Sequence, residues 1–117
     1  MTFLDEIKAL EERLVFQGYE VRRAEIVWKK DEALCPPEKK AEAIREHFAK
    51  IQWADAIAVI NPEKKGTAGY IGGNTLMEMA LAFHLEKEIY LMHDIPEVSY
   101  REEILGMLPR KLEELLA

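Results

Sequence analysis

The most informative segment of the chain is residues 56–93, AIAVINPEKKGTAGYIGGNTLMEMALAFHLEKEIYLMH. It begins with AIAVIN (56–61), an apolar run of strand length that is consistent with a strand buried on both faces. A loop over 62–73 follows, and then a helix over about 74–86 that is almost entirely apolar. EIYLMH (88–93) is a second strand. This alternation is typical of an α/β domain with a mainly parallel sheet.

The N-terminal part of the chain continues the alternation. Apolar residues at helical spacing predict an amphipathic helix that begins at Phe3 and ends before Gly18. YEVRRAEIVW (19–28) predicts a strand near a sheet edge, because charged residues interrupt it. Pro37 opens the next helix, since proline suits the first helical position.

The C-terminal part predicts one more helix. Ser99 and Glu102 have the spacing of a capping box, and the helix is expected to run through Leu108. Pro109 interrupts it, and leucines within 112–116 continue an apolar seam to the end of the chain.

Together these elements predict a single α/β domain over residues 1–117, a flavodoxin-like or Rossmann-like three-layer sandwich with a mainly parallel sheet. Three strands are few for this fold, and the chain opens on a helix where such a domain usually begins with a strand. We therefore expect a fold that is reduced at the N-terminus. We also expect a homodimer, because a short sheet and an amphipathic tail need cover and a second copy is its commonest source.

The composition excludes several classes of protein. The chain has 117 residues, of which 49% are hydrophobic, and this suits one domain with a single core. The net charge is −6, and no cluster of lysine and arginine is free of interleaved acids, so we expect no nucleic-acid partner. Residues 2–17 are amphipathic and acidic, so we expect no signal peptide there, and the longest apolar stretch, Met79–Phe83, is too short to span a membrane. We expect a cytoplasmic protein, and it stays open whether the natural chain starts upstream of Met1.

Cysteine and histidine usage argues against a metal or cofactor. Cys35 is the only cysteine, so neither an internal disulfide nor a cysteine metal site can form. The three histidines, His47, His84 and His93, show no metal spacing. We therefore expect no metal ion and no cofactor.

The loop before the apolar helix has the features of a small-molecule site. Gly72 and Gly73 permit close approach of a ligand to the backbone, and Asn74 or Thr75 caps the helix. The free N–H groups of the first turn can hold an anion such as phosphate. The helix dipole favours an ionised Glu78, which is the form that a nucleophile at an anomeric carbon must have.

Glu78 has a second interpretation. Thr75 and Glu78 have the spacing of a capping box, in which the glutamate only returns a hydrogen bond to the backbone. Spacing alone favours this structural role. The loop also lacks the lysine of a P-loop, so it does not identify a nucleotide by itself.

A resemblance adds to these observations. The loop GYIGGNTLME (69–78), the small-residue helix after it and the K-x-I-Y-L run at 87–91 resemble the nucleoside 2-deoxyribosyltransferase-like superfamily. The chain is most similar to an uncharacterised branch related to the 2′-deoxynucleoside 5′-phosphate N-hydrolases. The resemblance extends from Ala54 to Leu108, about half of the chain.

The resemblance implies a function and a set of site residues. Glu78 would be the nucleophile that attacks C1′ of a deoxynucleoside or its 5′-phosphate, expels the base and forms a glycosyl-enzyme intermediate. A second base or water would complete the reaction. The expected substrate-binding residues are Asn61, Tyr70, Gly72, Gly73, Asn74, Thr75 and His47. Tyr70 is either a stacking platform for a base or an exposed loop side chain.

His47 marks a departure from this family. It stands where active members carry an aspartate, shortly before Asp55, and it lies on the face of the expected helix that Ile44, Phe48 and Ile51 bury. It is therefore either a boundary residue or an acid, base or ligand-binding group. A second expected aspartate is replaced by glycine, so whether the chain is an enzyme stays open. The alternatives are a non-catalytic nucleotide-binding module and a structural homo-oligomer.

Overall fold

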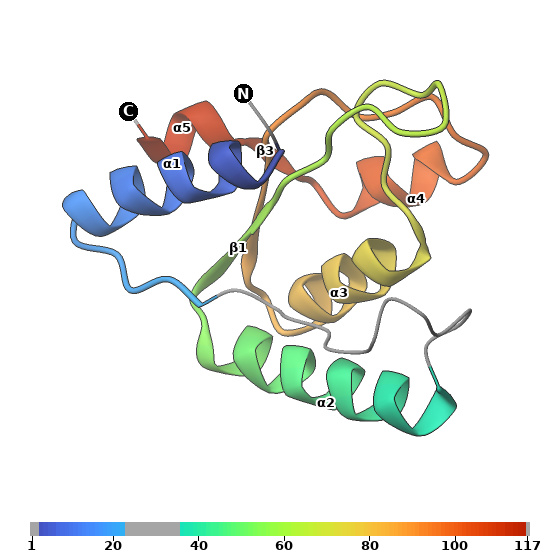
Figure 1. The fold of residues 1–117 in the computed structure, drawn as a ribbon. Helices are drawn as coiled ribbons and strands as arrows, with labels where there is room; N and C mark the ends of the chain where they lie inside the picture. The colour runs from blue at the N-terminus through green and yellow to red at the C-terminus, as the bar shows by residue number, and fades with distance from the viewer. Residues whose placement is uncertain (1–2, 23–35, 117) are drawn as a thin grey trace.

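This computed structural model describes residues 3–22 and 36–116 of the chain (Figure 1). The described elements follow one another in the order α1 (Phe3–Phe16), α2 (Pro37–Trp53), β1 (Ala56–Val59), α3 (Gly73–His84), β2 (Glu88–Leu91), α4 (Arg101–Gly106), β3 (Arg110–Lys111) and α5 (Leu112–Leu116). Pro37 occupies the start of α2, as predicted.

The three described strands form a small parallel sheet in the order β1–β2–β3. Ala56 pairs with Glu88 and Val59 with Leu91, and α3 crosses over between these two strands. The predicted strand–helix–strand unit is therefore confirmed, and the fold is an α/β arrangement around a parallel sheet. The carboxyl ends of β1 and β2 lie at the same edge, where such sheets bind ligands.

The third strand of this sheet was not predicted. Arg110 and Lys111 pair with Tyr90 and Leu91, directly after the proline that ends the preceding segment. A two-residue strand is too short to show a period-2 pattern, so it cannot be recognised from the sequence. Of the strand predicted at 19–28, residues 19–22 have no regular secondary structure, and the remainder lies outside the described residues.

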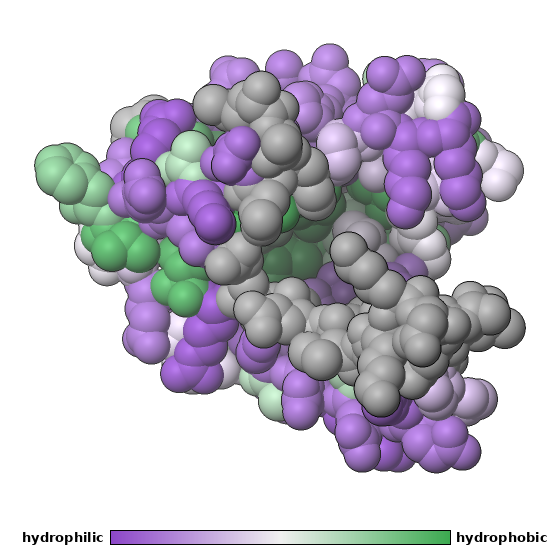
Figure 2. All heavy atoms as spheres, viewed as in Figure 1, coloured by the Kyte–Doolittle hydropathy of each residue, from purple (hydrophilic) through white to green (hydrophobic). Residues whose placement is uncertain are grey.

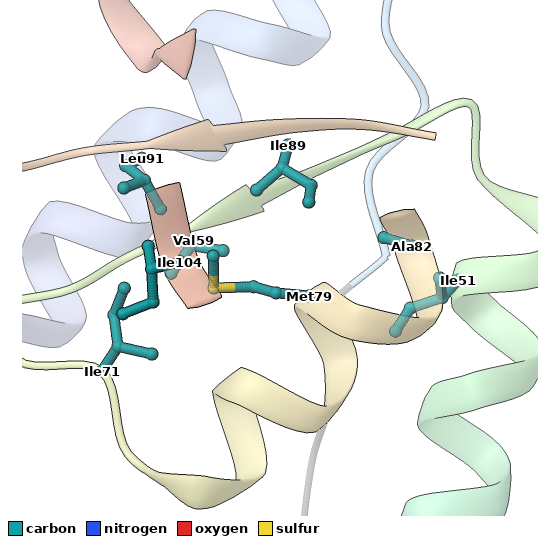
Figure 3. Close-up of a cluster of buried hydrophobic side chains, with 8 residues drawn as sticks. All are labelled: Ile51, Val59, Ile71, Met79, Ala82, Ile89, Leu91 and Ile104. Carbon is teal, nitrogen blue, oxygen red and sulfur yellow. The ribbon is translucent and has the colours of Figure 1, made fainter. Parts of the chain in front are cut away.

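Neighbouring residues of β2 point to opposite faces of the sheet and enter two different apolar clusters. On one face lie Ile51, Val59, Ile71, Met79, Ala82, Ile89, Leu91 and Ile104 (Figure 3). The other face carries Leu10, Leu14, Tyr90 and Leu112 from α1, β2 and α5. The sheet is thus packed on both sides by helices from different parts of the chain.

Two sequence predictions need correction. β1 is not buried along its length, because Ala58 is exposed; within the described part of the chain, β1 pairs with a strand on one side only. The capping box at Ser99 and Glu102 does not form: α4 begins at Arg101 after Tyr100, without a side-chain cap. A turn in which Arg101 N donates to Val98 O delays the start of this helix.

Across residues 3–22 and 36–116, none of the helices combines the length and apolar character that crossing a bilayer requires.

Tyr90 joins the sheet to the C-terminal segment through a polar network. Its hydroxyl donates a hydrogen bond to Glu88 Oε2. Arg110 lies 3.6 Å from Glu88 Oε1 and 2.7 Å from Glu114 Oε2, and its guanidinium carbon is 5.7 Å from the centre of the Tyr90 ring. The hydrogen bond to the Glu88 carboxylate, followed by burial, raises the pKa of Tyr90 above its ordinary 10.0, and Arg110 opposes this shift.

The raised pKa of Tyr90 predicts a loss of stability in alkali. The folded state holds this proton more tightly than the unfolded chain, so the stabilisation is complete below the ordinary pKa of about 10 and is lost as the pH rises through the folded-state pKa. Tyr90→Phe should therefore lose less unfolding free energy than the wild type between roughly pH 9 and pH 11, measured by urea denaturation. Equal losses in the two proteins would contradict the assignment.

Candidate functional site

The N-terminus of α3 differs from the predicted one. Gly72 is the N-cap, with φ −85° and ψ −178°, and no side chain caps the helix. Leu76 N donates to Gly72 O at 2.9 Å, which closes the first turn. The helix thus begins before Asn74 and Thr75, so neither residue is the cap, and Glu78 lies in the second turn. The capping-box interpretation of Glu78 is therefore wrong.

Glu78 is instead paired with a residue of α2. His47 Nδ1 lies 2.7 Å from Glu78 Oε1, a distance for a charge-assisted hydrogen bond. The two side chains retain 27% and 23% of their accessible surface, respectively. The pair is thus shielded enough to be ordered and exposed enough to meet a small ligand. The structure brings together two residues that the sequence named separately.

Apolar packing of α2 against α3 holds this pair in place. Ile51 lies one helical turn after His47, and Met79 directly follows Glu78. Ile51, Met79 and Ala82 are almost completely buried in one cluster, and Phe48 packs against it (Figure 3). Because both helices are fixed by these contacts, the histidine and the glutamate meet at the rim of the apolar interface.

Four of the expected binding residues lie directly before Glu78 in the chain, at positions 72–75. Asn74 and Thr75 precede it by four and three positions, so they share its side of α3. Gly73 is exposed, and a Cβ at this position would meet no heavy atom within 4 Å. A Cβ at Gly72 would lie 3.4 Å from the Tyr70 ring, an ordinary contact. The space at the start of α3 is thus open in the described structure.

Asn61, an expected ligand contact, connects two loops in the structure. Its side chain is buried, and Nδ2 donates to Gly69 O at 3.1 Å and to His93 O at 3.2 Å. Its Oδ1 accepts a hydrogen bond from His93 N at 2.9 Å. The amide therefore joins the loop after β1 to the loop after β2. Both of its polar atoms, Nδ2 and Oδ1, form hydrogen bonds with backbone atoms. A polar residue directly after an apolar strand was the only sequence signal for this connection.

Gly69 allows the two loops to approach each other. Its φ is +69°, and a Cβ there would lie 2.4 Å from Asp94 O. Gly66 also has a positive φ, +75°, but a Cβ at that position would meet nothing within 4 Å. The first glycine is thus required by both conformation and space, and the second by conformation alone.

A pocket of about 620 Å³ lies between these loops, at the carboxyl ends of β1 and β2. Its lining residues are Glu63, Gly66, Thr67, Ala68, Gly69, His93, Asp94, Ile95 and Glu97. His93 and Asp94 follow β2, so this part of the lining comes from the loop at the carboxyl end of that strand. Glu78 and His47 are not among the lining residues, so the pocket and the Glu78–His47 pair are separate features.

Tyr70 is a half-buried residue of the loop that precedes α3. Lys65 Nζ lies 5.6 Å from the centre of its ring. The neighbouring Tyr100 donates a hydrogen bond to Ile71 O, and burial, followed by the charge and hydrogen bond of Tyr70, raises the pKa of Tyr100. Tyr70 is thus part of the packing around the glycine loop as well as a candidate ligand contact.

No group of three or more histidine, cysteine, aspartate or glutamate side chains suited to a metal ion occurs in the parts of the chain that the structure describes. Searches against protein-family models, characterised proteins and solved structures found no match to this chain. The resemblance drawn from the glycine loop therefore stays a prediction.

The two glycines give a matched test of the connection between the loops. Gly69→Ala should cost more unfolding free energy than Gly66→Ala, because only the first places a Cβ against the backbone of the other loop. The left-handed conformation alone costs roughly 1–2 kcal/mol in each variant, and the steric conflict at Gly69 adds to it. Urea denaturation of both variants measures the difference. Equal destabilisation would show that the loops can separate without cost.

Proposed function

We propose that the protein cleaves or transfers the N-glycosidic bond of a deoxynucleoside or its 5′-monophosphate, with Glu78 as the nucleophile. The observation that carries this proposal is the 2.7 Å pairing of Glu78 with His47 at a partly exposed position. In a capping box the glutamate carboxylate bonds the backbone at the helix start, whereas Glu78 lies in the second turn of α3, beyond the cap. A hydrogen bond to one oxygen of a carboxylate orients the group and leaves the second oxygen to act as the nucleophile.

The chemistry requires one oxygen of Glu78 to reach the sugar. His47 engages Oε1, and the second oxygen, Oε2, would attack C1′ while the bond from C1′ to the base breaks. The product is a glycosyl ester on Glu78, which a second base or a water molecule then resolves. Gly73, Asn74 and Thr75 lie toward the start of α3, where backbone N–H groups favour the hydroxyl or phosphate groups of the substrate.

We also propose a three-layer fold and a homodimeric assembly for this chain. We infer a reduced flavodoxin-like three-layer sandwich, supported by the apolar clusters on both faces of the sheet. A homodimer would cover apolar side chains that the single chain leaves in water. Val15 and Phe16 retain 58% and 93% of their accessible surface, and Figure 2 shows apolar surface over the end of α1. A cytoplasmic location stays a prediction.

The enzymatic proposal predicts a clear effect of one substitution. Purified protein should release free base from at least one of a panel of deoxynucleosides and their 5′-monophosphates, followed by liquid chromatography. Glu78→Gln should reduce base release to the level of the buffer blank with the fold intact, because an amide is a much weaker nucleophile than a carboxylate. Glu46→Gln is the matched control, since Glu46 is exposed next to His47 on α2, and it should leave the activity unchanged.

Two results would contradict the enzymatic proposal. One is release of base by Glu78→Gln at the wild-type rate. The other is the failure of the wild-type protein to act on any member of the panel, alone or with a second free base as acceptor.

The second candidate function is a nucleoside-binding module without catalysis. The pocket between the loops favours it, because it lies where α/β sheets bind ligands and does not include Glu78. Three carboxylates, those of Glu63, Asp94 and Glu97, line this pocket, so an uncharged nucleoside fits it better than a phosphorylated one. Calorimetric binding of a nucleoside by the wild type and by Glu78→Gln alike, without base release from either, would support this function over the first.

A further inference from the structure

We propose that His47 is the acid that protonates the departing base. This inference rests on the proposed function, because it assigns a second role in the same reaction. A nucleobase that leaves without a proton departs as an unstable anion, so cleavage of the glycosidic bond is helped by an acid within reach of the base. Glu78 cannot supply that proton, because it must be ionised to attack C1′.

Within residues 3–22 and 36–116, the surroundings of Glu78 offer one candidate for this acid. On α3 the residues that share its side, Asn74 and Thr75, carry no acidic proton. Among the described residues, His47 is the ionic partner of Glu78 within 4 Å. The carboxylates and the histidine that line the pocket belong to other loops, and Glu78 is not part of that lining. An imidazole is also the side chain best suited to gain and lose a proton near neutral pH.

The two nitrogens of the imidazole ring would have different tasks: one holds Glu78, and the other protonates the base. Nδ1 lies 2.7 Å from Glu78 Oε1, so this nitrogen holds the nucleophile. Nε2 is the other ring nitrogen, and in the doubly protonated ring it is a second donor. The His47 side chain keeps 27% of its surface accessible, and the proposal takes Nε2 as the atom that meets the base. One residue can thus orient the carboxylate with one nitrogen and protonate the base with the other.

The proposed step balances in atoms and charge. A lone pair of Glu78 Oε2 forms the bond to C1′, and the electrons of the broken C1′–N bond pass to the base. The proton on His47 Nε2 moves to a nitrogen of the base, which leaves as a neutral molecule, and His47 becomes neutral. In hydrolysis, water then attacks C1′, the ester oxygen returns to Glu78 as a carboxylate, and the proton of the water returns to Nε2. The net reaction consumes one water and releases one base and one sugar.

Two substitutions of His47 separate its two tasks. In His47→Asn, the side-chain amide nitrogen takes the place of Nδ1 and can still donate to Glu78, but it has no proton to transfer. In His47→Ala, both the hydrogen bond and the acid are lost. Circular dichroism and urea denaturation establish that each variant is folded before its activity is compared, and Glu46→Gln again serves as the neutral control.

Two substrates reveal which task matters. 2′-Deoxyguanosine needs a proton on its base, whereas 7-methyl-2′-deoxyguanosine already carries a positive charge there and releases a neutral base. His47→Asn should lose roughly 10²–10⁴-fold in kcat on the first substrate, the range typical of a lost general acid. It should retain nearly wild-type kcat on the second, after subtraction of the spontaneous rate. His47→Ala should be impaired on both. If the wild type accepts only pyrimidines, 2′-deoxyuridine and 5-fluoro-2′-deoxyuridine replace the pair, since the fluorinated base leaves more easily as an anion.

The outcomes distinguish this inference from the function on which it rests. Equal losses of His47→Asn on both substrates of a pair, with an active wild type, would overturn the proton transfer and leave the nucleophile in place. Full activity of His47→Asn on the substrate that needs a proton would do the same. Failure of the wild type on every purine and pyrimidine substrate would overturn both the inference and the proposed function.

Discussion

The packing of α2 against α3 is the constraint on which the candidate site depends. Ile51 from one helix and Met79 and Ala82 from the other are almost completely buried in the same cluster (Figure 3). Burial of an isoleucine or methionine side chain stabilises a fold by about 1.5–3 kcal/mol, which is more than a partly exposed ionic pair contributes by itself. The apolar contact therefore fixes the helices, and the pairing of His47 with Glu78 follows from their positions. A polar group at the rim of such a contact is both ordered and accessible, which is what a reactive group needs.

A second constraint acts at the edge of the sheet. The buried amide of Asn61 joins the loops after β1 and β2, and Gly69 lets their backbones meet. A buried amide without partners would cost about 1–3 kcal/mol, so these hydrogen bonds also explain why a polar residue can occupy that position. The pocket lies beside this connection, and α3 begins after the same loop. Loop geometry at one end of the sheet thus determines both the shape of the pocket and the start of the helix that carries Glu78.

The sequence predicted the elements whose patterns are local. β1, α3 and β2 follow from apolar runs and helical spacing, and α2 follows from Pro37. β3 could not be predicted, because two residues show no period, and its pairing with β2 depends on the tertiary fold. The predicted cap of α3 was wrong. The helix begins after Gly72, which has no side chain that could cap it, and the capping-box spacing of Thr75 and Glu78 is coincidental. Each side chain of the site was named from the sequence, but the contact between His47 and Glu78 joins two helices, and no local pattern reports it.

A double-mutant cycle tests the central claim, that Glu78 is held by His47 and not by the helix cap. The unfolding free energies of His47→Ala, Glu78→Ala and the double variant give the coupling between these two side chains, and Thr75→Ala with Glu78→Ala gives the coupling to the cap. The account predicts a coupling of roughly 0.5–3 kcal/mol between residues 47 and 78, the range for side chains in contact, and almost none between residues 75 and 78. Strong coupling of Glu78 to Thr75, with none to His47, would contradict it.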